Sequence, residues 1–255
     1  MKITFLGTGT SHGVPMIGCD CAVCQSTDPR DRRMRTSVLI ATDDGGQLLV
    51  DTGPDLRAQA LLYNVRRVDG ILFTHGHADH IFGLDEVRRY NSLQRRPMAC
   101  YADELTLDDI RRTFGYVFEP GPSTGGGIPE IELFRILGSF CVGRQEVQPV
   151  KVMHGRRPIL GYRLGGFAYL TDCSEIPDES WPLLHDLDVL VLDALRITPH
   201  PTHFSLSEAI AAARRIGARR SYFTHICHDL SHAGISAGLP PGIELAYDGL
   251  MVECA

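Results

Sequence analysis

The sequence has no apolar run long enough to cross a bilayer, and the apolar stretch near its start is too short for a secretory signal peptide. We therefore expect a cytoplasmic protein that does not contact a membrane. An excess of basic residues is also missing, since 31 acidic residues against 25 Lys and Arg give a formal charge of −6. Nucleic-acid binders normally carry a net basic face, so this balance argues against a nucleic-acid partner.

Internal repeats and low-complexity segments are absent as well, which excludes solenoid and array architectures. The 255 residues, 44% of them hydrophobic, are enough to bury a core, and they predict a single domain over residues 1–255. In a reducing compartment the eight cysteines will not form a disulfide framework. Their uneven distribution, with three at Cys19, Cys21 and Cys24, indicates a metal site or catalysis instead.

Secondary structure is predicted to be mostly β, with helices between the later strands. Short apolar runs predict strands at residues 3–6, 37–41, 48–50, 71–74, 99–102, 147–152, 159–164, 167–171, 189–193, 221–224 and 244–247. Helices are predicted at residues 81–93, 104–114, 178–185 and 205–216, the last with Ser205 and Glu208 as a capping box. Asp43-Asp44-Gly45-Gly46 predicts a hairpin. Residues 116–129, rich in Gly and Pro, are either a lid or a surface loop.

A run of potential metal ligands, His75-Gly76-His77-Ala78-Asp79-His80, directly follows the predicted strand at residues 71–74. His75 and His77 alternate along the turn after the strand and can bind one ion. Asp79 and His80 open the next helix and can bind a second ion nearby. One histidine alone would be an ordinary core or surface residue, but four polar residues in six positions cannot all be core.

Two ions need more ligands than this run provides, and further candidates stand where other strands end. His154, Asp172 and His225 each follow a predicted strand, and a carboxylate such as Asp172 can bridge two cations. Asp51 ends a strand in the same manner. We interpret it as a carboxylate that orients a ligand imidazole, with a simple Asx turn as the alternative.

This order of ligands resembles that of the metallo-β-lactamase-fold hydrolases. The resemblance covers essentially the whole chain and implies an α+β fold, an αββα sandwich of two mixed sheets with helices on the outer faces. It implies that one metal is held by His75, His77, His154 and Asp172. The other would be held by Asp79, His80, Asp172 and His225.

The cysteine cluster offers three thiolates within six residues, a spacing that suits one tetrahedral zinc with a ligand still missing. Candidates for the fourth ligand lie in residues 226–232, which include Cys227, His228 and His232. Such a closed site would hold the N-terminal loop to the C-terminal segment and take no part in chemistry.

The segment from Gly7 to Pro15 followed by Cys-x-Cys-x-x-Cys is similar to that of the PhnP group of this fold. That resemblance implies a phosphodiesterase acting on 5-phosphoribosyl 1,2-cyclic phosphate, with a metal-bridging hydroxide as nucleophile. It also selects His228 as the fourth zinc ligand and implies manganese or zinc in the dinuclear site. The same pattern occurs in the pyrroloquinoline-quinone biosynthesis protein of this fold, so the motif alone does not define a substrate.

Hydrolysis of a small or cyclic phosphodiester requires a proton for the leaving group, and His203 is the candidate. It precedes a capped helix, and the PhnP group carries a histidine in this place. His200 is a nearby competitor and His12 a more distant one. Together with Asp79, His203 completes the predicted catalytic residues, while Arg156, close behind His154, is a candidate for binding the substrate phosphate.

Other functions remain as alternatives. A tRNA 3′-processing-type endoribonuclease normally inserts a long basic arm, which this sequence lacks. A carboxylic ester, thioester or lactone hydrolase of the same fold is a second alternative, and a metal-binding biosynthetic accessory protein is the non-enzymatic one. A homodimer is compatible with the sequence.

Overall fold

The computed structural model describes residues 1–119 and 127–255, and in this part of the chain two mixed sheets of seven strands each form the fold. In the first sheet the strand order is β14 (Met251–Glu253), β1 (Lys2–Gly7), β2 (Ser37–Ala41), β3 (Gln47–Val50), β4 (Gly70–Leu72), β5 (Met98–Ala102) and β6 (Ile131–Arg135). In the second it is β13 (Ile243–Leu245), β12 (Arg220–Thr224), β11 (Val189–Asp193), β10 (Phe167–Leu170), β9 (Arg157–Leu164), β8 (Gln145–His154) and β7 (Phe140–Val142).

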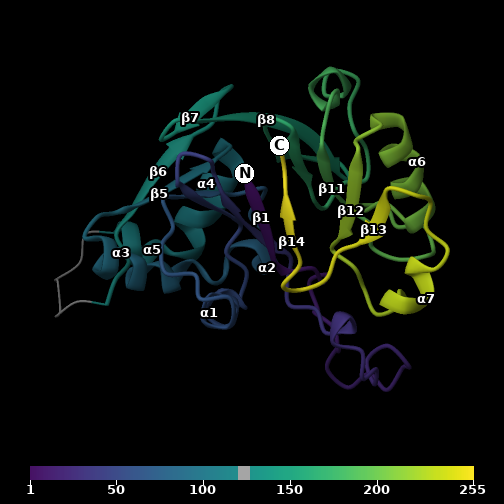
Figure 1. Cartoon of the computed structure of the whole chain (residues 1–255). Coiled ribbons are helices and arrows are strands. Elements are labelled where there is room, and N and C mark those ends of the chain that lie inside the picture. Colours follow the sequence, from purple (N-terminus) through teal and green to yellow (C-terminus); the bar gives the residue numbers. More distant parts are fainter. Residues whose placement is uncertain (120–126) are drawn as a thin grey trace.

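Each sheet combines an antiparallel and a parallel half. In the first sheet β14, β1, β2 and β3 pair antiparallel, and the strands from β3 to β6 run parallel. In the second, β10 to β13 are parallel and β7 to β10 antiparallel. Both chain ends lie in the middle of the molecule, where β1 and β14 are neighbours (Figure 1).

The helices are α1 (Leu56–Leu62), α2 (Ala78–Ile81), α3 (Arg88–Gln94), α4 (Glu104–Thr113), α5 (Gly115–Phe118), α6 (Leu206–Ile216) and α7 (His232–Ser236). Figure 1 shows α1, α3, α4 and α5 beside the first sheet and α6 and α7 beside the second. Among the described helices, none is long and apolar enough to span a bilayer.

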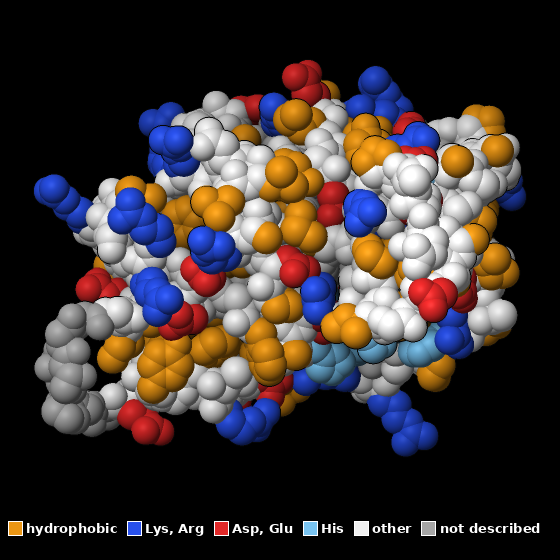
Figure 2. All heavy atoms as spheres, turned by 90° about the horizontal axis from the view of Figure 1, so that it is seen from below, with side chains coloured by type: hydrophobic (Ala, Val, Ile, Leu, Met, Phe, Trp, Pro, Cys, Tyr) orange, Lys and Arg blue, Asp and Glu red, His pale blue; other side chains and the backbone are white. Residues whose placement is uncertain are grey.

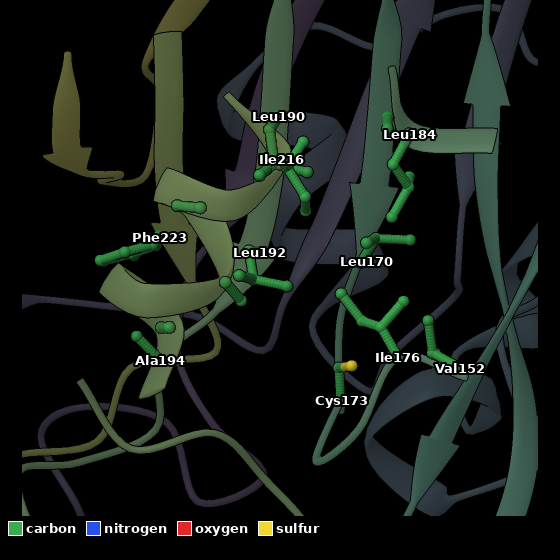
Figure 3. Packing of buried hydrophobic residues seen from close by; sticks show 14 of the residues in the cluster. Val152, Leu170, Cys173, Ile176, Leu184, Leu190, Leu192, Ala194, Ile216 and Phe223 are labelled. Carbon is green, nitrogen blue, oxygen red and sulfur yellow. The ribbon is translucent and has the colours of Figure 1, made fainter. Parts of the chain in front are cut away.

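The positions of the buried side chains explain how the sheets and helices are layered. Phe5 and Val50 of the first sheet meet Tyr169 and Val191 of the second in a core between the sheets. A further core lies on the outer face of each sheet, and Figure 3 shows the one in which Leu192 and Phe223 pack with Ile216 of α6. Strands buried on both faces need a cover on each side. The other sheet covers the inner face of each sheet, and the helices cover its outer face. The expected αββα sandwich is therefore confirmed.

Two of the four predicted helices have the expected extent. Helix α6 begins at the predicted capping box, in which the Ser205 side chain accepts from the Glu208 backbone, and it ends at Gly217 in the left-handed region. Helix α4 closely matches residues 104–114. The hairpin is also confirmed, because β2 and β3 pair antiparallel around the Asp43–Gly46 turn, where Thr42 N–H donates to Gly46 O.

The other two helix predictions are wrong in part. Residues 81–93 are divided into α2, a 3-10 turn at Leu84–Val87 and α3. The division follows Gly83, where an added Cβ would lie 2.1 Å from the Gly53 carbonyl oxygen, so a tertiary contact determines the local path. Residues 178–185 contain only the 3-10 turn Trp181–Leu184, since Pro182 has no N–H for a longer helix.

Three strands lack the sequence pattern that predicts a strand. Strands β6, β7 and β14 are short or largely exposed, so their sequences lack a clear apolar run. Of the predicted loop at 116–129, residues 116–118 belong to α5, and residues 120–126 lie outside the described residues. The lid therefore stays a prediction.

Candidate dinuclear metal centre

The predicted ligands are brought to one edge of the sandwich by the ends of four strands. His75 follows β4, with His77 to His80 continuing into α2, and His154 is the last residue of β8. Asp172 and His225 follow β10 and β12, and both have positive φ, of 57° and 56°. Left-handed backbone is strained for these residue types, and such strain is concentrated at functional sites. Figure 2 shows histidines gathered on the face where these strands end.

The side chains form two adjacent groups. Ligand atoms of His75, His77 and His154 all lie within 4.8 Å of one another, as do those of a second group, Asp79, His80, Asp172 and His225. Within the first group, His75 Nε2 and His77 Nδ1 are 2.9 Å apart.

Asp172 connects the two groups. Its Oδ2 lies 3.8 Å from His75 Nε2 and 3.4 Å from His225 Nε2, and its Oδ1 lies 3.3 Å from His80 Nε2. Asp79 Oδ2 approaches the same two imidazoles of the second group, at 3.3 Å from His80 and 3.5 Å from His225. The carboxylate of Asp172 is thus placed where a bridging ligand would be.

Divalent cations fit these residues. His80 Nε2 and both ring nitrogens of His225 are buried without a hydrogen-bond partner among the described residues. Buried polar atoms that lack a partner are unfavourable, and a metal ion satisfies such nitrogens. Imidazole and carboxylate ligands together suit zinc or manganese.

A second layer of contacts orients the ligands. His80 Nδ1 is 2.7 Å from Asp51 Oδ2, and Asp51 also accepts from the backbone N–H and the hydroxyl of Thr74, at 2.8 Å each. This is the contact predicted for Asp51. His154 Nδ1 donates to the Thr202 carbonyl at 2.8 Å. In both rings the hydrogen bond leaves Nε2 to face the centre.

The electrostatics of Asp172 and of the first group favour the deprotonated forms that a metal requires, whereas in His80 and His225 the carboxylates of Asp172 and Asp79 outweigh burial and raise the pKa. Burial opposes ionisation of Asp172, but the imidazoles of His225 and His80 outweigh it and hold its pKa well below the usual range. Burial also lowers the pKa of His75, His77 and His154. At Asp172, His75, His77 and His154, metal binding therefore does not have to overcome protonation at neutral pH.

His203 lies beside the second group of ligands. Its Nε2 is 3.9 Å from Asp172 Oδ2, and its ring stacks on that of His225 with centroids 4.8 Å apart. Nδ1 of His203 is 3.1 Å from Asp193 Oδ2. Burial lowers the pKa of His203 to about 4. The competitor His200 belongs to neither ligand group, and its ring centroid lies 5.2 Å from that of His203.

The cysteine cluster forms a separate site. The sulfur atoms of Cys19, Cys21 and Cys24 lie 3.2, 3.4 and 3.6 Å from His228 Nδ1. The backbone N–H of Cys24 donates to Cys21 Sγ and is the main cause that lowers the pKa of Cys21 to about 6, whereas burial raises the pKa of Cys24 to about 11. Three sulfurs and one imidazole within 4.8 Å of one another suit a closed zinc site.

Several residues that hold the site residues in place were not predicted from the sequence. Buried Arg33 donates to the carbonyls of Cys227 and Leu230 and pairs with Asp31, which holds the N-terminal loop against the segment that carries His228. Asp193, the partner of His203, ends a buried strand just as Asp51 does, so the same signal was available. Arg156 is exposed in the turn after His154, and none of its contacts with the described residues gives it a role.

Known proteins show the same fold and, in two cases, more than 40% identity over nearly the whole chain. Residues 47–226 match the family model described as a beta-lactamase superfamily domain. The crystal structure of a new diphosphatase from the PhnP family is 45% identical, covers 99% of this chain and 97% of that one, and superposes with a TM-score of 0.92. Zn(2+)-bound PqqB from Methylobacterium extorquens shares the fold, with a TM-score of 0.80 at 19% identity over 99% of this chain and 100% of that one.

An octanoyltransferase from Porphyromonas gingivalis (strain ATCC BAA-308 / W83) is 41% identical over 98% of this chain but 51% of its own length. The chain therefore spans about half the length of that relative. Coenzyme PQQ synthesis protein B from Methylobacterium nodulans (strain LMG 21967 / CNCM I-2342 / ORS 2060) is 28% identical over 76% of this chain and 72% of that protein. These matches, with the ligand arrangement, confirm the expected resemblance to the PhnP group: the chain belongs to the beta-lactamase superfamily, as a metallo-β-lactamase-fold protein related to a PhnP-family diphosphatase.

Proposed function

We propose that the protein is a dinuclear metal-dependent phosphodiesterase that hydrolyses a small or cyclic phosphodiester. One observation carries the proposal: two groups of metal ligands meet at Asp172, and His203, a group able to donate a proton, lies 3.9 Å from that carboxylate. Phosphodiester hydrolysis needs both parts, positive charge for the phosphoryl oxygens and a proton for the leaving oxygen.

The proposed first metal site consists of His75, His77, His154 and Asp172, and the second of Asp79, His80, Asp172 and His225. When bound, two divalent cations would supply Lewis acidity and positive charge for an anionic phosphoryl group. Asp51 accepts a hydrogen bond from His80, and the Thr202 carbonyl accepts one from His154. Both imidazoles are thereby held in the orientation that metal binding needs. A structural zinc would be held by Cys19, Cys21, Cys24 and His228.

His203 is proposed to act as the general acid. Water adds a hydroxyl to phosphorus, the bond from phosphorus to the leaving oxygen breaks, and the proton of His203 Nε2 passes to that oxygen. The neighbouring Asp193 holds Nδ1, so the ring keeps Nε2 toward the centre. A proton lost by the attacking water then restores His203. An anionic substrate next to the ring favours its protonated form, which burial disfavours in the free site.

The resemblance to the PhnP group makes 5-phosphoribosyl 1,2-cyclic phosphate the first substrate to test. A second candidate is the phosphoanhydride bond of a diphosphate, which is favoured by the 45% identity to a diphosphatase. The two reactions differ in the leaving group, because a sugar alkoxide needs a proton far more than a phosphate does.

The experiment compares leaving groups. His203→Ala should reduce kcat/KM on an alkyl diester by about 10² to 10⁴, and far less on bis(p-nitrophenyl) phosphate, whose leaving group needs no proton. His185→Ala, at an exposed position, is the control. If kcat/KM of His203→Ala falls equally on both substrates, His203 is not the general acid.

A substrate panel tests the reaction class. Protein reconstituted with manganese or zinc should hydrolyse cyclic or small linear phosphodiesters, with a diphosphate diester testing the second candidate. Turnover restricted to precursor tRNA, or to an ester, lactone or octanoyl thioester, would reverse the proposal in favour of those alternatives. Metal binding without turnover on any of these substrates would favour an accessory role. Light scattering tests separately whether the chain forms a homodimer.

A further inference from the structure

Three hydroxyl groups meet in the core between the two sheets. Thr36 Oγ1 lies 2.8 Å from Thr224 Oγ1 and 3.2 Å from the hydroxyl oxygen of Tyr169. All three side chains are buried, with exposed fractions of 1% or less. The core around Tyr169 is built from apolar side chains such as Val38 and Val191. The three residues therefore form a hydroxyl cluster within a largely apolar layer.

The Thr36 hydroxyl is the partner that the other two hydroxyls share. Among the residues that the structure describes, neither the Tyr169 hydroxyl nor Thr224 Oγ1 has another hydrogen-bond partner. Burial raises the pKa of Tyr169, so its hydroxyl stays protonated and can donate. Buried polar groups without a partner are unfavourable, and the hydrogen bonds that satisfy them are strict in geometry. The hydroxyl cluster therefore opposes movement of Thr36 relative to its two partners.

The hydroxyl cluster lies directly behind two of the expected metal ligands. Thr224 is the last residue of β12 and immediately precedes His225, and Tyr169 of β10 stands three residues before Asp172. In the second sheet β11 lies between β10 and β12, so Thr36 contacts two strands that are not neighbours. One side chain thus connects both of the strands that lead to these ligands.

The segment that carries Thr36 is bonded to the first sheet. Thr36 directly precedes β2, and the hydroxyl of the first residue of that strand, Ser37, donates to the carbonyls of Val50 and Asp51 at 2.9 and 3.3 Å. Asp51 also accepts a hydrogen bond from His80. The hydroxyl cluster is therefore connected to the strand end that orients a ligand of the first sheet.

The second group of ligands needs such a connection because its members come from both sheets. Asp79 and His80 follow β4 of the first sheet, whereas Asp172 and His225 follow strands of the second. A shift of one sheet against the other would change the separations between these ligand atoms. Metal ligands have to lie within about 0.2 Å of their preferred distances, so even a small shift would weaken binding.

We propose that Thr36 is a positioning residue for the dinuclear centre. Its hydroxyl fixes the strands that lead to Asp172 and His225 relative to the first sheet, which supplies Asp79 and His80. It acts through the other two members of the hydroxyl cluster and takes no part in the chemistry itself. The inference rests on the dinuclear centre of the proposed function and adds the contact that holds the second group of ligands together.

The first test measures metal binding, so it does not depend on turnover. Manganese is added to wild type, Thr36→Val and Thr36→Ser, each with its structural zinc and with empty dinuclear sites, and electron paramagnetic resonance follows the signal of two spin-coupled ions. Thr36→Val keeps the shape of the side chain and loses the hydroxyl, so the coupled signal should require about 10- to 100-fold more manganese. Thr36→Ser keeps the hydroxyl and should stay close to the wild type.

Thr106→Val is the matched control. Thr106 of α4 is buried to the same extent as Thr36, and its hydroxyl has no hydrogen-bond partner in the described part of the chain, so this variant should bind manganese as the wild type does. Thermal unfolding shows that each variant is folded. A purely structural role would lower the thermal midpoint of Thr36→Val and leave the coupled signal unchanged. That result, or equal losses in Thr36→Val and Thr36→Ser, would overturn the positioning role.

A second variant keeps the test decisive if Thr36→Val does not fold. Tyr169→Phe removes one hydroxyl of the cluster and keeps the ring, so it should raise the manganese requirement about two- to fivefold, the effect of one hydrogen bond. Adding Tyr169→Phe to Thr36→Val should cause no further loss, because both substitutions break the same bond. Unchanged binding in Tyr169→Phe, or losses that multiply in the double variant, would refute the shared contact.

The wild type separates this inference from the proposed function. If it gives no spin-coupled signal at any manganese concentration, the dinuclear centre is refuted and the positioning role with it. If it binds both ions and hydrolyses no phosphodiester, only the proposed reaction is refuted, and the manganese titrations of the variants still decide the role of Thr36.

Discussion

Asp109 and Arg157 form an ion pair of 2.6 Å that joins the two halves of the sandwich next to the metal ligands. Asp109 belongs to α4, which packs on the first sheet, and Arg157 begins β9 of the second sheet, three residues after His154. The same carboxylate lies against Gly76, where an added Cβ would come within 2.3 Å of Asp109 Oδ2. The pair therefore connects the turn that carries His75 and His77, on the first sheet, with the end of β8 that carries His154, on the second.

We expect Asp109→Asn to weaken metal binding at the group formed by His75, His77 and His154, because His154 loses its fixed position relative to the other two. Losses of about 10- to 100-fold in metal affinity are typical when a supporting contact is removed. Competition with a chromogenic chelator measures the affinity. Asp108→Asn, on the exposed side of the same helix, is the control and should bind metal as the wild type does. Equal affinity in Asp109→Asn and wild type would contradict the positioning role.

Asp51→Asn should also reduce metal affinity, by about 10- to 100-fold. Both carboxylate oxygens of Asp51 accept hydrogen bonds, from Thr74 and His80. In Asn an NH2 group, which can only donate, replaces one of these oxygens. Asn tolerates the left-handed backbone of position 51, where φ is 62°, so the loop itself should keep its path. Calorimetric titration with manganese measures the change, and wild-type affinity in the variant would show that His80 is oriented in another way.

The cysteine site should be separable from the dinuclear centre. Cys21→Ser should lose one zinc per chain and lower the thermal midpoint, because zinc binding contributes to folding stability. The other two metals should remain. Elemental analysis of the purified variants gives the metal content, and Cys141→Ser, at an exposed position on β7, serves as the control. Loss of all metals from Cys21→Ser together with unaltered stability would contradict this separation.

The stability of the protein should depend on pH through Asp248. Burial raises the pKa of this carboxyl from 3.8 to about 7, although Met34 N–H and the Thr8 hydroxyl donate to it. A raised pKa in the folded state means that the folded protein binds more protons between these pH values, so its stability falls as pH rises through that window. Asp248→Asn removes this dependence.

Denaturant unfolding at several pH values checks the prediction for Asp248. Between about pH 4 and 7, the stability of the wild type relative to Asp248→Asn should decline by up to about 1.4 kcal/mol per pH unit. A difference between the two proteins that is the same at pH 4 and pH 7 would show that Asp248 has an ordinary pKa.

Most strands, two helices and the candidate ligands could be predicted from local patterns, whereas the αββα sandwich and the grouping of the ligands around two metals were implied by the family resemblance. His75 to His80 form one contiguous run, and His154, Asp172 and His225 each follow an apolar strand, so their positions at strand ends marked them as ligand candidates. The capping box at Ser205 and Glu208 located α6 for the same reason. These features depend on neighbours in the chain, and the periodicity of strands and helices reveals them.

The parts that were not predicted depend on contacts between distant segments. Gly83 divides a predicted helix because it packs on Gly53. The ion pair of Asp109 with Arg157 has a sequence separation of 48 residues, and neither residue stands out in a pattern. The hydroxyl cluster around Thr36 is formed by three separate segments, and a single sequence does not specify which segments meet.

The most direct test of the proposed activity is a titration of metal-free active sites in protein that retains its structural zinc. Hydrolysis of bis(p-nitrophenyl) phosphate is followed as manganese is added, for wild type and Asp172→Asn. The account predicts that wild-type activity rises until two equivalents per chain are bound, and that Asp172→Asn, which lacks the bridging carboxylate, stays inactive over the same range. Activity that is independent of added manganese, or that is equal in Asp172→Asn and wild type, would contradict a dinuclear phosphodiesterase.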